Sequence, residues 1–581
     1  MSLLRIRALT HVAPCLPACE TVRMTRFALI VLVACSCGSP KSPRSPARLA
    51  ELSTSVLADL DRLAPADAVS LGHHQYDGRL PDLSAAGLAE EIATLDRDRG
   101  ELEQIDASRL TAAQLEDRDT LVQELRRRLF EDVVLDRYHT NPMAYADAIN
   151  LDAYISRDYA PAAARAAAVI AMCRAIPAYL AQARANLKTP IPLPWVETAL
   201  KQTTGFAEFA DKDIRQQLGT ANHGDIGPAL DACKQAFHDH GQWLEKQLAT
   251  GTKDFALGTD RFLRMLSEEQ GISLDLETLQ RAVDEDLARN TAAITEAAHA
   301  IDPSQPVADV VAAAARDRPT PDQVLEVARQ QTDELRKFII DHKLVTIPSD
   351  DVATVRETPV FKRWNQAFLD GPGPFERKQL TSFYYISPPD PSWSIEVQHE
   401  YVSPRADLLF TTAHEVYPGH FIHGLHVRKN PSAVLRSLWF FATGEGWAHY
   451  AEEMMYDEGA GGRTPQNHIG QLKEALLRDV RFLVAIGEHT NGMTVDQAVV
   501  LFRERAFVDP GNAGQQAVRG TFDPMYLSYT LGKLIIRKLR VDWMAEHPGA
   551  TLGEFHDAFL SHGAAPLPVI RRAMGITTPI L

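Results

Sequence analysis

The chain has 581 residues, of which 45% are hydrophobic and 23% are charged, and its formal net charge is −16. A chain of this length and composition can bury a large apolar core, which predicts a globular protein built as one large domain or as two lobes. The acidic charge argues against a nucleic-acid partner, because a protein that binds phosphates needs a basic face.

The N-terminal segment has the pattern of a bacterial export signal. The stretch "MTRFALIVLVACSCGSPKSPRSP" begins at Met24 and has a basic residue, Arg26, before an apolar run over residues 27–34. This run is too short to span a bilayer. We therefore predict that residues 1–23 are an untranslated upstream extension and that residues 24–34 are a signal peptide.

The end of the apolar run, "LVAC" at residues 32–35, resembles a lipobox, whose cysteine becomes the lipidated first residue of the mature chain. Residues 35–46 are rich in proline and serine and would then form a lipidated cysteine with a tether. The sequence thus predicts lipidation of Cys35 and anchoring to a membrane of the bacterial cell envelope, with the protein facing the periplasm or the cell surface. The alternative is a plain signal peptide.

Helical patterns dominate from residue 47 onward. Segments 85–105, 112–135 and 160–187 carry apolar residues at spacings of three and four among strong helix formers, and segment 276–301 does the same. We expect a helical scaffold over residues 47–350. Its two cysteines, Cys173 and Cys233, could pair in an oxidising compartment or simply be buried.

The character of the sequence changes between residues 359 and 404, where glycine and proline alternate with aromatic and β-branched runs. This composition predicts a few short strands. The adjacent tyrosines Tyr384 and Tyr385 could line a substrate groove beside an edge strand, which would hold an extended peptide by backbone pairing.

The stretch "HEVYPGHFIH", residues 414–423, departs from the zinc-hydrolase motif HExxH, in which two histidines share one helix face and the glutamate polarises water. His414 and His420 are about 120° apart around an ideal helix, so a regular helix cannot present both to one ion. Pro418 has no N–H to donate to the preceding turn, and Gly419 relaxes the backbone. The sequence therefore predicts a disturbed helix that brings His420 back to the side of His414.

A second helical pattern follows in "GEGWAHYAEEMMYDEG", residues 444–459. Glu445, His449 and Glu452 lie on one face of it. Glu445 stands between two glycines after an apolar run, so we expect a buried carboxylate that needs a partner. Two histidines and one carboxylate are a typical catalytic zinc set, with a fourth position for water. A solvated charged face is the other interpretation.

The strings HExxPGH and EGWAxYxE together resemble the bacterial family DUF885, which is grouped with gluzincin-type zinc metallopeptidases. Comparable stretches near residues 70, 180, 481 and 526 extend the resemblance over most of the chain after the tether. It implies one zinc ion held by His414, His420 and Glu445, with Glu415 as general base and proton shuttle.

The stretch "YLSYTLG", residues 526–532, is similar to segments of the thimet oligopeptidase family and of Taq-type carboxypeptidases. This resemblance implies that Tyr526 and Tyr529 bind the scissile carbonyl or the peptide backbone; otherwise both are core aromatics of an amphipathic helix. His489 belongs to a stretch that matches DUF885 and is a further candidate to stabilise the oxyanion. Ala485 stands where that family has an aspartate.

Two more histidines, His423 and His426, follow His420 at helical spacing and could be alternative ligands, second-sphere residues or surface residues.

We predict a mainly α fold with a large elongated helical domain and a small β-sheet beside a zinc-peptidase-like active-site cleft. Residues 351–581 would be the catalytic region, packed with the scaffold as one body.

The predicted function is a zinc-dependent metallopeptidase with a peptide substrate, and both endo- and exopeptidase action are compatible with the sequence. The alternatives are a zinc amidase or other hydrolase of a non-peptide bond, and a non-catalytic periplasmic binding lipoprotein with a relic metal site.

Overall fold

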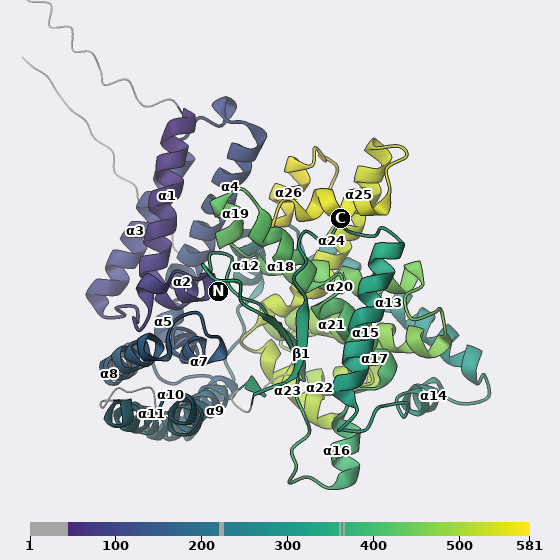
Figure 1. The fold of residues 1–581 in the computed structure, drawn as a ribbon, viewed down its shortest axis with the longest axis horizontal. Coiled ribbons are helices and arrows are strands. Elements are labelled where there is room, and N and C mark those ends of the chain that lie inside the picture. The colour runs from purple at the N-terminus through teal and green to yellow at the C-terminus, as the bar shows by residue number, and fades with distance from the viewer. Residues whose placement is uncertain (1–44, 220–225, 360–361, 364–365) are drawn as a thin grey trace, which may run out of the picture. The chain divides into compact units, whose positions relative to one another are not determined.

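The computed structural model describes residues 45–219, 226–359, 362–363 and 366–581. Within these residues the fold is mainly α with one small β-sheet (Figure 1), which confirms the fold class expected from the sequence patterns. Cys35, the expected extension and signal peptide, and the tether up to residue 44 lie outside the described residues.

The helices before residue 250 form two groups. They are α1 (Ser45–Leu63), α2 (Pro65–Leu71), α3 (Ala85–Glu103), α4 (Ala112–Leu129), α5 (Arg137–Thr140), α6 (Ala144–Asp147), α7 (Ala153–Ser156), α8 (Ala162–Asn186), α9 (Leu193–Phe209), α10 (Arg215–Leu218) and α11 (Ile226–Leu248). α1, α3 and α4 pack on one another through apolar side chains such as Leu49, Leu95 and Leu121. α8, α9 and α11 pack around a second apolar cluster.

The second group contains both cysteines of the scaffold. Cys173 on α8 and Cys233 on α11 are buried free thiols in contact with each other. α8 is long and apolar enough to cross a membrane by composition, but half of that apolar window is buried inside the structure. We therefore interpret α8 as a core helix.

The remaining helices surround the motifs of interest. They are α12 (Thr259–Gln270), α13 (Leu276–Ile301), α14 (Val307–Ala314), α15 (Val324–Asp341), α16 (Ile395–Tyr401), α17 (Arg405–Glu415), α18 (His420–Lys429), α19 (Ala433–Ser437), α20 (Phe441–Glu458), α21 (Pro465–Thr490), α22 (Val495–Arg505), α23 (Pro510–Gly520), α24 (Ser528–Glu546), α25 (Leu552–Leu560) and α26 (Leu567–Ala573). One apolar core continues through them, with α13 packed on α21 and α15 packed on α17.

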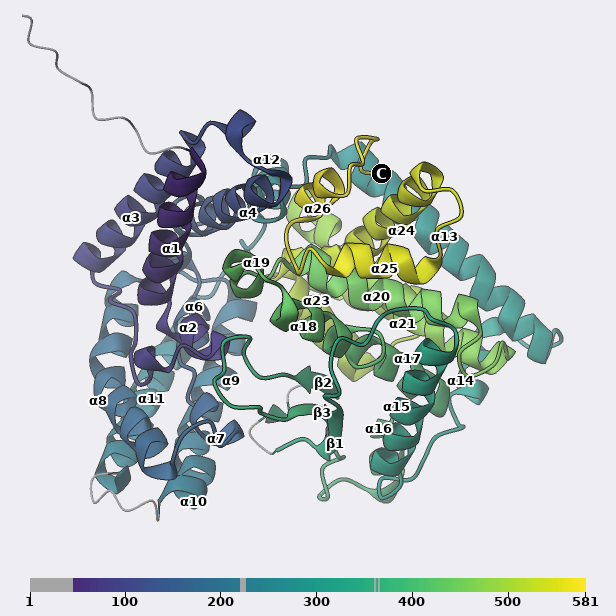
Figure 2. The same cartoon turned by 45° about the horizontal axis from the view of Figure 1, so that its top comes forward.

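The sheet has three strands, β1 (Ala353–Glu357), β2 (Ala367–Asp370) and β3 (Ser382–Ile386), in the order β1-β3-β2. β1 runs parallel to β3 and β2 runs antiparallel to it. β2 is thus an edge strand (Figure 2). It contacts α17. This edge is the part of the sheet that reaches the metal motif.

The expected groove position of Tyr384 and Tyr385 is wrong. Both lie on the central strand β3, where side chains on the two faces of the sheet are covered, and they are 0% and 5% exposed. The Tyr384 hydroxyl is hydrogen-bonded with the Thr412 hydroxyl of α17 at 3.1 Å. Tyr384 therefore fastens the sheet to the helix that carries His414, whereas the Tyr385 ring contacts Phe368 and Phe383 within the sheet.

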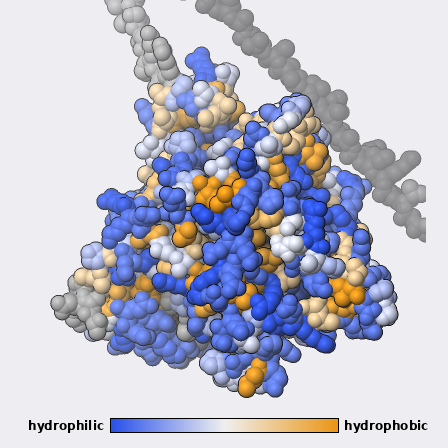
Figure 3. Space-filling model, turned by 45° about the vertical axis from the view of Figure 1, so that its right-hand side comes forward, coloured by the Kyte–Doolittle hydropathy of each residue, from blue (hydrophilic) through white to orange (hydrophobic). Residues whose placement is uncertain are grey.

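The surface drawn in Figure 3 is predominantly hydrophilic. Hydrophobic residues form small patches there, separated by hydrophilic ones. Scattered apolar side chains of this kind are normal for a protein surface in water.

Candidate metal centre

The backbone at "HEVYPGH" is a break between two helices. α17 ends at Glu415 and α18 begins at His420, and the Tyr417–Pro418 peptide bond in between is cis. The Gly419 N–H donates to the Ala413 carbonyl at 2.9 Å, across six residues instead of the four of an α-helix. The two additional residues expected from the sequence are thus accommodated as a short loop that restarts the helix at His420.

Gly419 is required in this loop for a steric reason. A Cβ atom at this position would lie 1.7 Å from the carbonyl oxygen of His414. Every other residue carries a Cβ that would clash with the His414 carbonyl, so only glycine fits here. The loop is therefore specified by its glycine as well as by Pro418.

Three side chains from α17, α18 and α20 converge. The Glu445 Oε2 atom lies 3.5 Å from His414 Nε2 and 3.4 Å from His420 Nε2, and one donor atom from each residue lies within 4.8 Å of the others. The two distances from Glu445 Oε2 suit atoms that each lie about 2 Å from a shared zinc ion, and the widest separation would have to shorten to about 4 Å or less for all three atoms to bind it. Glu445 Oε2 is buried without a hydrogen bond. A buried carboxylate oxygen of this kind needs a cation, so the donor set fits zinc.

Two glycines bring Glu445 to this position. A Cβ at Gly446 would lie 2.6 Å from Gly532 Cα, so α20 and α24 cross with their backbones in close approach. A Cβ at Gly444 would lie 2.3 Å from the Trp439 ring. The glycines on both sides of Glu445 therefore allow the tight packing that their position in the sequence suggested.

Glu452 holds the His414 ring from behind. Its Oε1 lies 2.6 Å from His414 Nδ1 and 3.1 Å from Arg478 Nη2, and the carboxylate is fully buried. Ligating histidines typically donate their second N–H to such a carboxylate, which aims the other nitrogen at the metal. The sequence had placed Glu452 on the face of Glu445 without giving it a role.

The charges in this arrangement are strongly coupled. Burial alone would lower the pKa of His414, but its contacts with Glu445 and Glu452 outweigh burial and raise that pKa to about 9. Burial raises and Arg478 lowers the pKa of Glu452, and the net direction is downward. The carboxylates thus stay ionised and hold positive charge between them.

Glu415 lies beside the donor cluster without belonging to it. Its Oε2 accepts a hydrogen bond from the Leu369 N–H at 2.8 Å, and Leu369 is on the edge strand β2. The carboxylate is half-buried. Glu415 therefore connects the end of the helix that carries His414 to the edge of the sheet.

Tyr529 is the one tyrosine of "YLSYTLG" that the structure brings to the cluster. Its ring stacks with that of His414 at a centroid distance of 6.3 Å. The guanidinium groups of Arg478 and Arg481 lie over the Tyr529 ring at 5.6 and 5.0 Å. Neither arginine was expected from the sequence as part of the site.

The structure does not bring Tyr526 or His489 to the site, which corrects two of the expected catalytic positions. The Tyr526 hydroxyl is fully buried against Gly520, next to Glu488. His489 uses both ring nitrogens for the backbone, with Nε2 donating to Gly520 O at 2.8 Å and Nδ1 accepting from Leu257 N–H at 3.3 Å. Its position is about 16 Å along α21 from Arg478, given 1.5 Å per residue.

His423 and His426 also point away from the cluster. His423 Nε2 contacts the Gly563 carbonyl at 2.9 Å, and His426 Nε2 contacts the Thr346 carbonyl at 2.9 Å. Burial lowers the pKa of His423 to about 3. These two histidines therefore fasten α18 to neighbouring loops and do not join the three donors.

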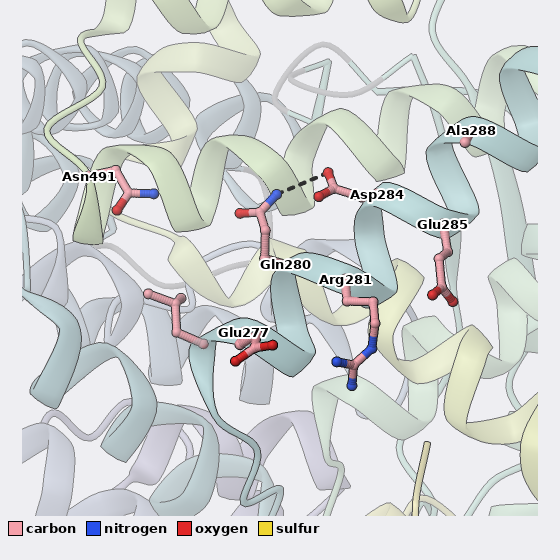
Figure 4. A pocket seen from close by; sticks show the side chains of 8 residues that line it. Glu277, Gln280, Arg281, Asp284, Glu285, Ala288 and Asn491 are labelled. Atoms are coloured by element: carbon pink, nitrogen blue, oxygen red, sulfur yellow. Dashed lines mark hydrogen bonds between the residues drawn. The ribbon is translucent and has the colours of Figure 1, made fainter.

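A pocket of about 740 Å³ lies elsewhere, along α13 (Figure 4). Its lining includes Glu277, Arg281 and Glu285, and Gln280 donates to Asp284 at 3.0 Å. These are separate charged side chains along one exposed helix, and they do not converge on a point. The pocket therefore offers no chemistry comparable to that at His414.

The chain belongs to a family of bacterial proteins of unknown function, DUF885, which it matches over residues 65–574. It is similar to a solved structure from Shewanella oneidensis, described as a candidate lipoprotein of unknown function, with 25% identity, a TM-score of 0.77 and coverage of 90% of this chain and 99% of that chain. A candidate lipoprotein from Colwellia psychrerythraea has 18% identity, a TM-score of 0.72 and coverage of 91% and 98%. No curated protein matches the chain.

Proposed function

We propose that this protein is a zinc-dependent metallopeptidase related to the gluzincins, with one zinc ion held by His414, His420 and Glu445. The observation that carries the proposal is the convergence of these three donors, with the half-buried Glu415 directly after His414 in the chain. Three protein ligands and an adjacent carboxylate are the arrangement of a catalytic zinc site.

The residues around the donors have matching roles in hydrolysis. Zinc bound there would polarise the scissile carbonyl and acidify the attacking water. Glu415 accepts a proton from that water and delivers it to the leaving nitrogen. Tyr529 donates a hydrogen bond to the oxyanion. Burial and the nearby Glu445 raise the pKa of the Tyr529 phenol, so it keeps its proton at neutral pH.

The edge strand supports a peptide as the substrate. The Leu369 N–H of β2 points to Glu415 and not to β3, so this side of the strand has backbone groups to offer. An extended peptide can add to such an edge through backbone hydrogen bonds. Binding there would carry the scissile bond past Glu415.

We also propose that the protein is a lipoprotein of the cell envelope, anchored through Cys35. The lipobox-like stretch supports this, and so does the description of both similar structures as candidate lipoproteins. The Cys35→Ala variant should leave the membrane fraction or retain its signal peptide. Normal processing and membrane retention of that variant would contradict the anchor.

The experiment for the activity compares zinc-loaded protein with its Glu415→Gln variant on a mixed peptide library, read by mass spectrometry. We expect turnover by the wild-type protein and a loss of about 100- to 10,000-fold in the variant, because a general base contributes that much. Glu400→Gln is the matched control, since Glu400 also follows a histidine but is exposed; its activity should not change.

Other outcomes of the same experiment favour the alternatives. Turnover of non-peptide amides without peptide cleavage would indicate an amidase. Zinc binding without any turnover would indicate a binding lipoprotein with a relic site. Equal activity of the wild-type protein and Glu415→Gln would contradict the role of Glu415.

A further inference from the structure

Three arginines surround Tyr529, and one of them differs from the others in its charge partners. Arg478 pairs with Glu452 at 3.1 Å and with Glu474 at 2.6 Å. Arg519 pairs with Asp523 at 2.7 Å. Arg481 forms no ion pair with any of the residues that the structure describes, although it is only 8% exposed.

The surroundings of Arg481 are polar, and the carboxylate that acts on it from a distance, Glu474, is itself paired with Arg478 at 2.6 Å. Its Nε donates to the Gln516 side-chain oxygen at 2.8 Å, and its guanidinium lies over the Tyr529 ring. Ala485 lies one helical turn further along α21, at a position from which an acidic side chain could pair with Arg481. Alanine carries no charge, so no pair forms there. Burial, together with the positive charges of Arg519 and Arg478, lowers the pKa of Arg481 to about 10.

A buried cation without a partner is costly, and an anionic ligand removes that cost. The guanidinium group matches a carboxylate in geometry, because its planar N–H groups can form two parallel hydrogen bonds. The Nη groups of Arg481 have no hydrogen-bond partner among the described residues, since its hydrogen bond with Gln516 uses Nε. Two donors are therefore available for a carboxylate.

The position of Arg481 determines how close a bound carboxylate would lie to the scissile bond of the proposed reaction. Tyr529 links the two sites, because its ring stacks with that of His414 and also lies 5.0 Å from the Arg481 guanidinium. In a peptide, only the nitrogen and Cα of the last residue separate the final scissile carbonyl from the C-terminal carboxylate. A cation next to the tyrosine beside the metal donors can therefore reach a carboxylate close to the scissile bond.

We propose that Arg481 binds a carboxylate of the substrate, which makes peptides with a negative charge near the scissile bond the substrate class of this site. The inference rests on the proposed peptidase function. The carboxylate comes from the C-terminus of the peptide, which would make the protein a carboxypeptidase, or from an aspartate or glutamate side chain.

Binding tests this proposal without turnover. The receptor is the full mature protein with Glu415→Gln, which cannot use its general base. The probes are three pools of acetylated tripeptides with randomised neutral residues: one with a free C-terminal carboxylate, one with a C-terminal amide, and one with a C-terminal amide and a single glutamate. Bound peptides are quantified by mass spectrometry after equilibrium dialysis, with and without zinc.

We expect one of the two carboxylate pools to bind about 10- to 100-fold more tightly than the neutral amide pool, as a charge-assisted pair implies. Preference for the free C-terminus identifies an exopeptidase, and preference for glutamate identifies recognition of a side chain. Adding Arg481→Gln should abolish the preference. Arg505→Gln makes the same charge change at an exposed site and should leave the preference unchanged.

Equal binding of all three pools would overturn the proposal, and so would a preference that survives Arg481→Gln. If Arg481→Gln does not fold, Arg481→Lys keeps the charge without the fork and should reduce the preference at least about threefold. Failure of the two proposals is distinguishable. A carboxylate preference without any turnover by the wild-type protein contradicts the peptidase, whereas turnover without that preference contradicts only the subsite.

Discussion

The α8–α9–α11 group and the α17–α20–α21–α24 group are both helix bundles, but they bury different kinds of side chain. The centre of α8 buries apolar residues such as Val169, Ile176 and Leu180. The centres of α20 and α21 bury charged residues such as Glu452 and Arg478.

Buried charges contribute little net stability, because desolvation opposes the attraction between the partners. A bundle that needed only stability would therefore resemble α8. In the other group the charges are connected, since Glu452 contacts both His414 and Arg478. The first group thus has the composition of a structural bundle, whereas in the second group buried charge holds the ring of His414, one of the three converging residues.

The largest effect that sharpens this comparison is expected in the apolar group. Ile176→Ala should lower the free energy of unfolding by about 2–5 kcal/mol, because it leaves a cavity around a fully buried side chain. Zinc bound per folded chain should not change. Urea unfolding and metal analysis measure the two quantities, and Ile340→Ala, at an exposed position, is the control. Loss of zinc from folded Ile176→Ala would break the division of roles.

Glu452→Gln should change zinc binding more than the free energy of unfolding, which is the opposite of Ile176→Ala. We expect zinc affinity to fall about 10- to 100-fold, since removing the carboxylate behind a ligating histidine typically has that effect. Competition with a chelator measures it. Glu474→Gln is the matched control, because Glu474 also pairs with Arg478 but does not contact His414. An equal loss of affinity in both variants would mean that the effect comes from Arg478 and not from the orientation of the His414 ring.

The sequence predicted the helices of both regions, but it predicted only part of the buried charged residues in the second. The spacing of apolar residues was sufficient to predict the long helices. The spacing within the two motifs was sufficient to predict that His414, His420 and Glu445 converge. Arg478 could not be assigned in this way, since its contact with Glu452 depends on how α20 and α21 pack.

The two tyrosines show the same limit at short range. Tyr526 and Tyr529 are three residues apart, but Tyr526 lies in a 3-10 turn, Pro524–Leu527, before α24 begins. Its side chain therefore leaves the chain in a different direction from that of Tyr529. Both residues are tyrosines in one short motif, so only the path of the backbone distinguishes their positions.

The smallest expected effect concerns a buried carboxyl group on α21 that has no ion-pair partner among the residues described. Burial raises the pKa of Glu488 from its ordinary 4.5 to about 8. As pH rises through this range, the unfolded chain releases its proton first, so the folded state loses stability until about pH 8. Glu488→Gln removes this cost and should gain about 1–3 kcal/mol over wild type at pH 8, with little gain at pH 5.

Urea unfolding at the two pH values checks this expectation. Glu504→Gln, at an exposed position of α22, provides the control for a change of net charge. A gain for Glu488→Gln that is the same at pH 5 and pH 8 would show that ionisation of Glu488 is not the cause.

The central claim is that His414, His420 and Glu445 form one zinc site across the loop at Pro418–Gly419. Its most direct test is the zinc content per chain after loading and dialysis, measured by inductively coupled plasma mass spectrometry for the wild-type protein, Glu415→Gln and Glu445→Ala. We expect one zinc per chain in the first two proteins and a clear loss in Glu445→Ala. A wild-type protein that holds no zinc, or a Glu445→Ala variant that holds as much as wild type, would contradict it.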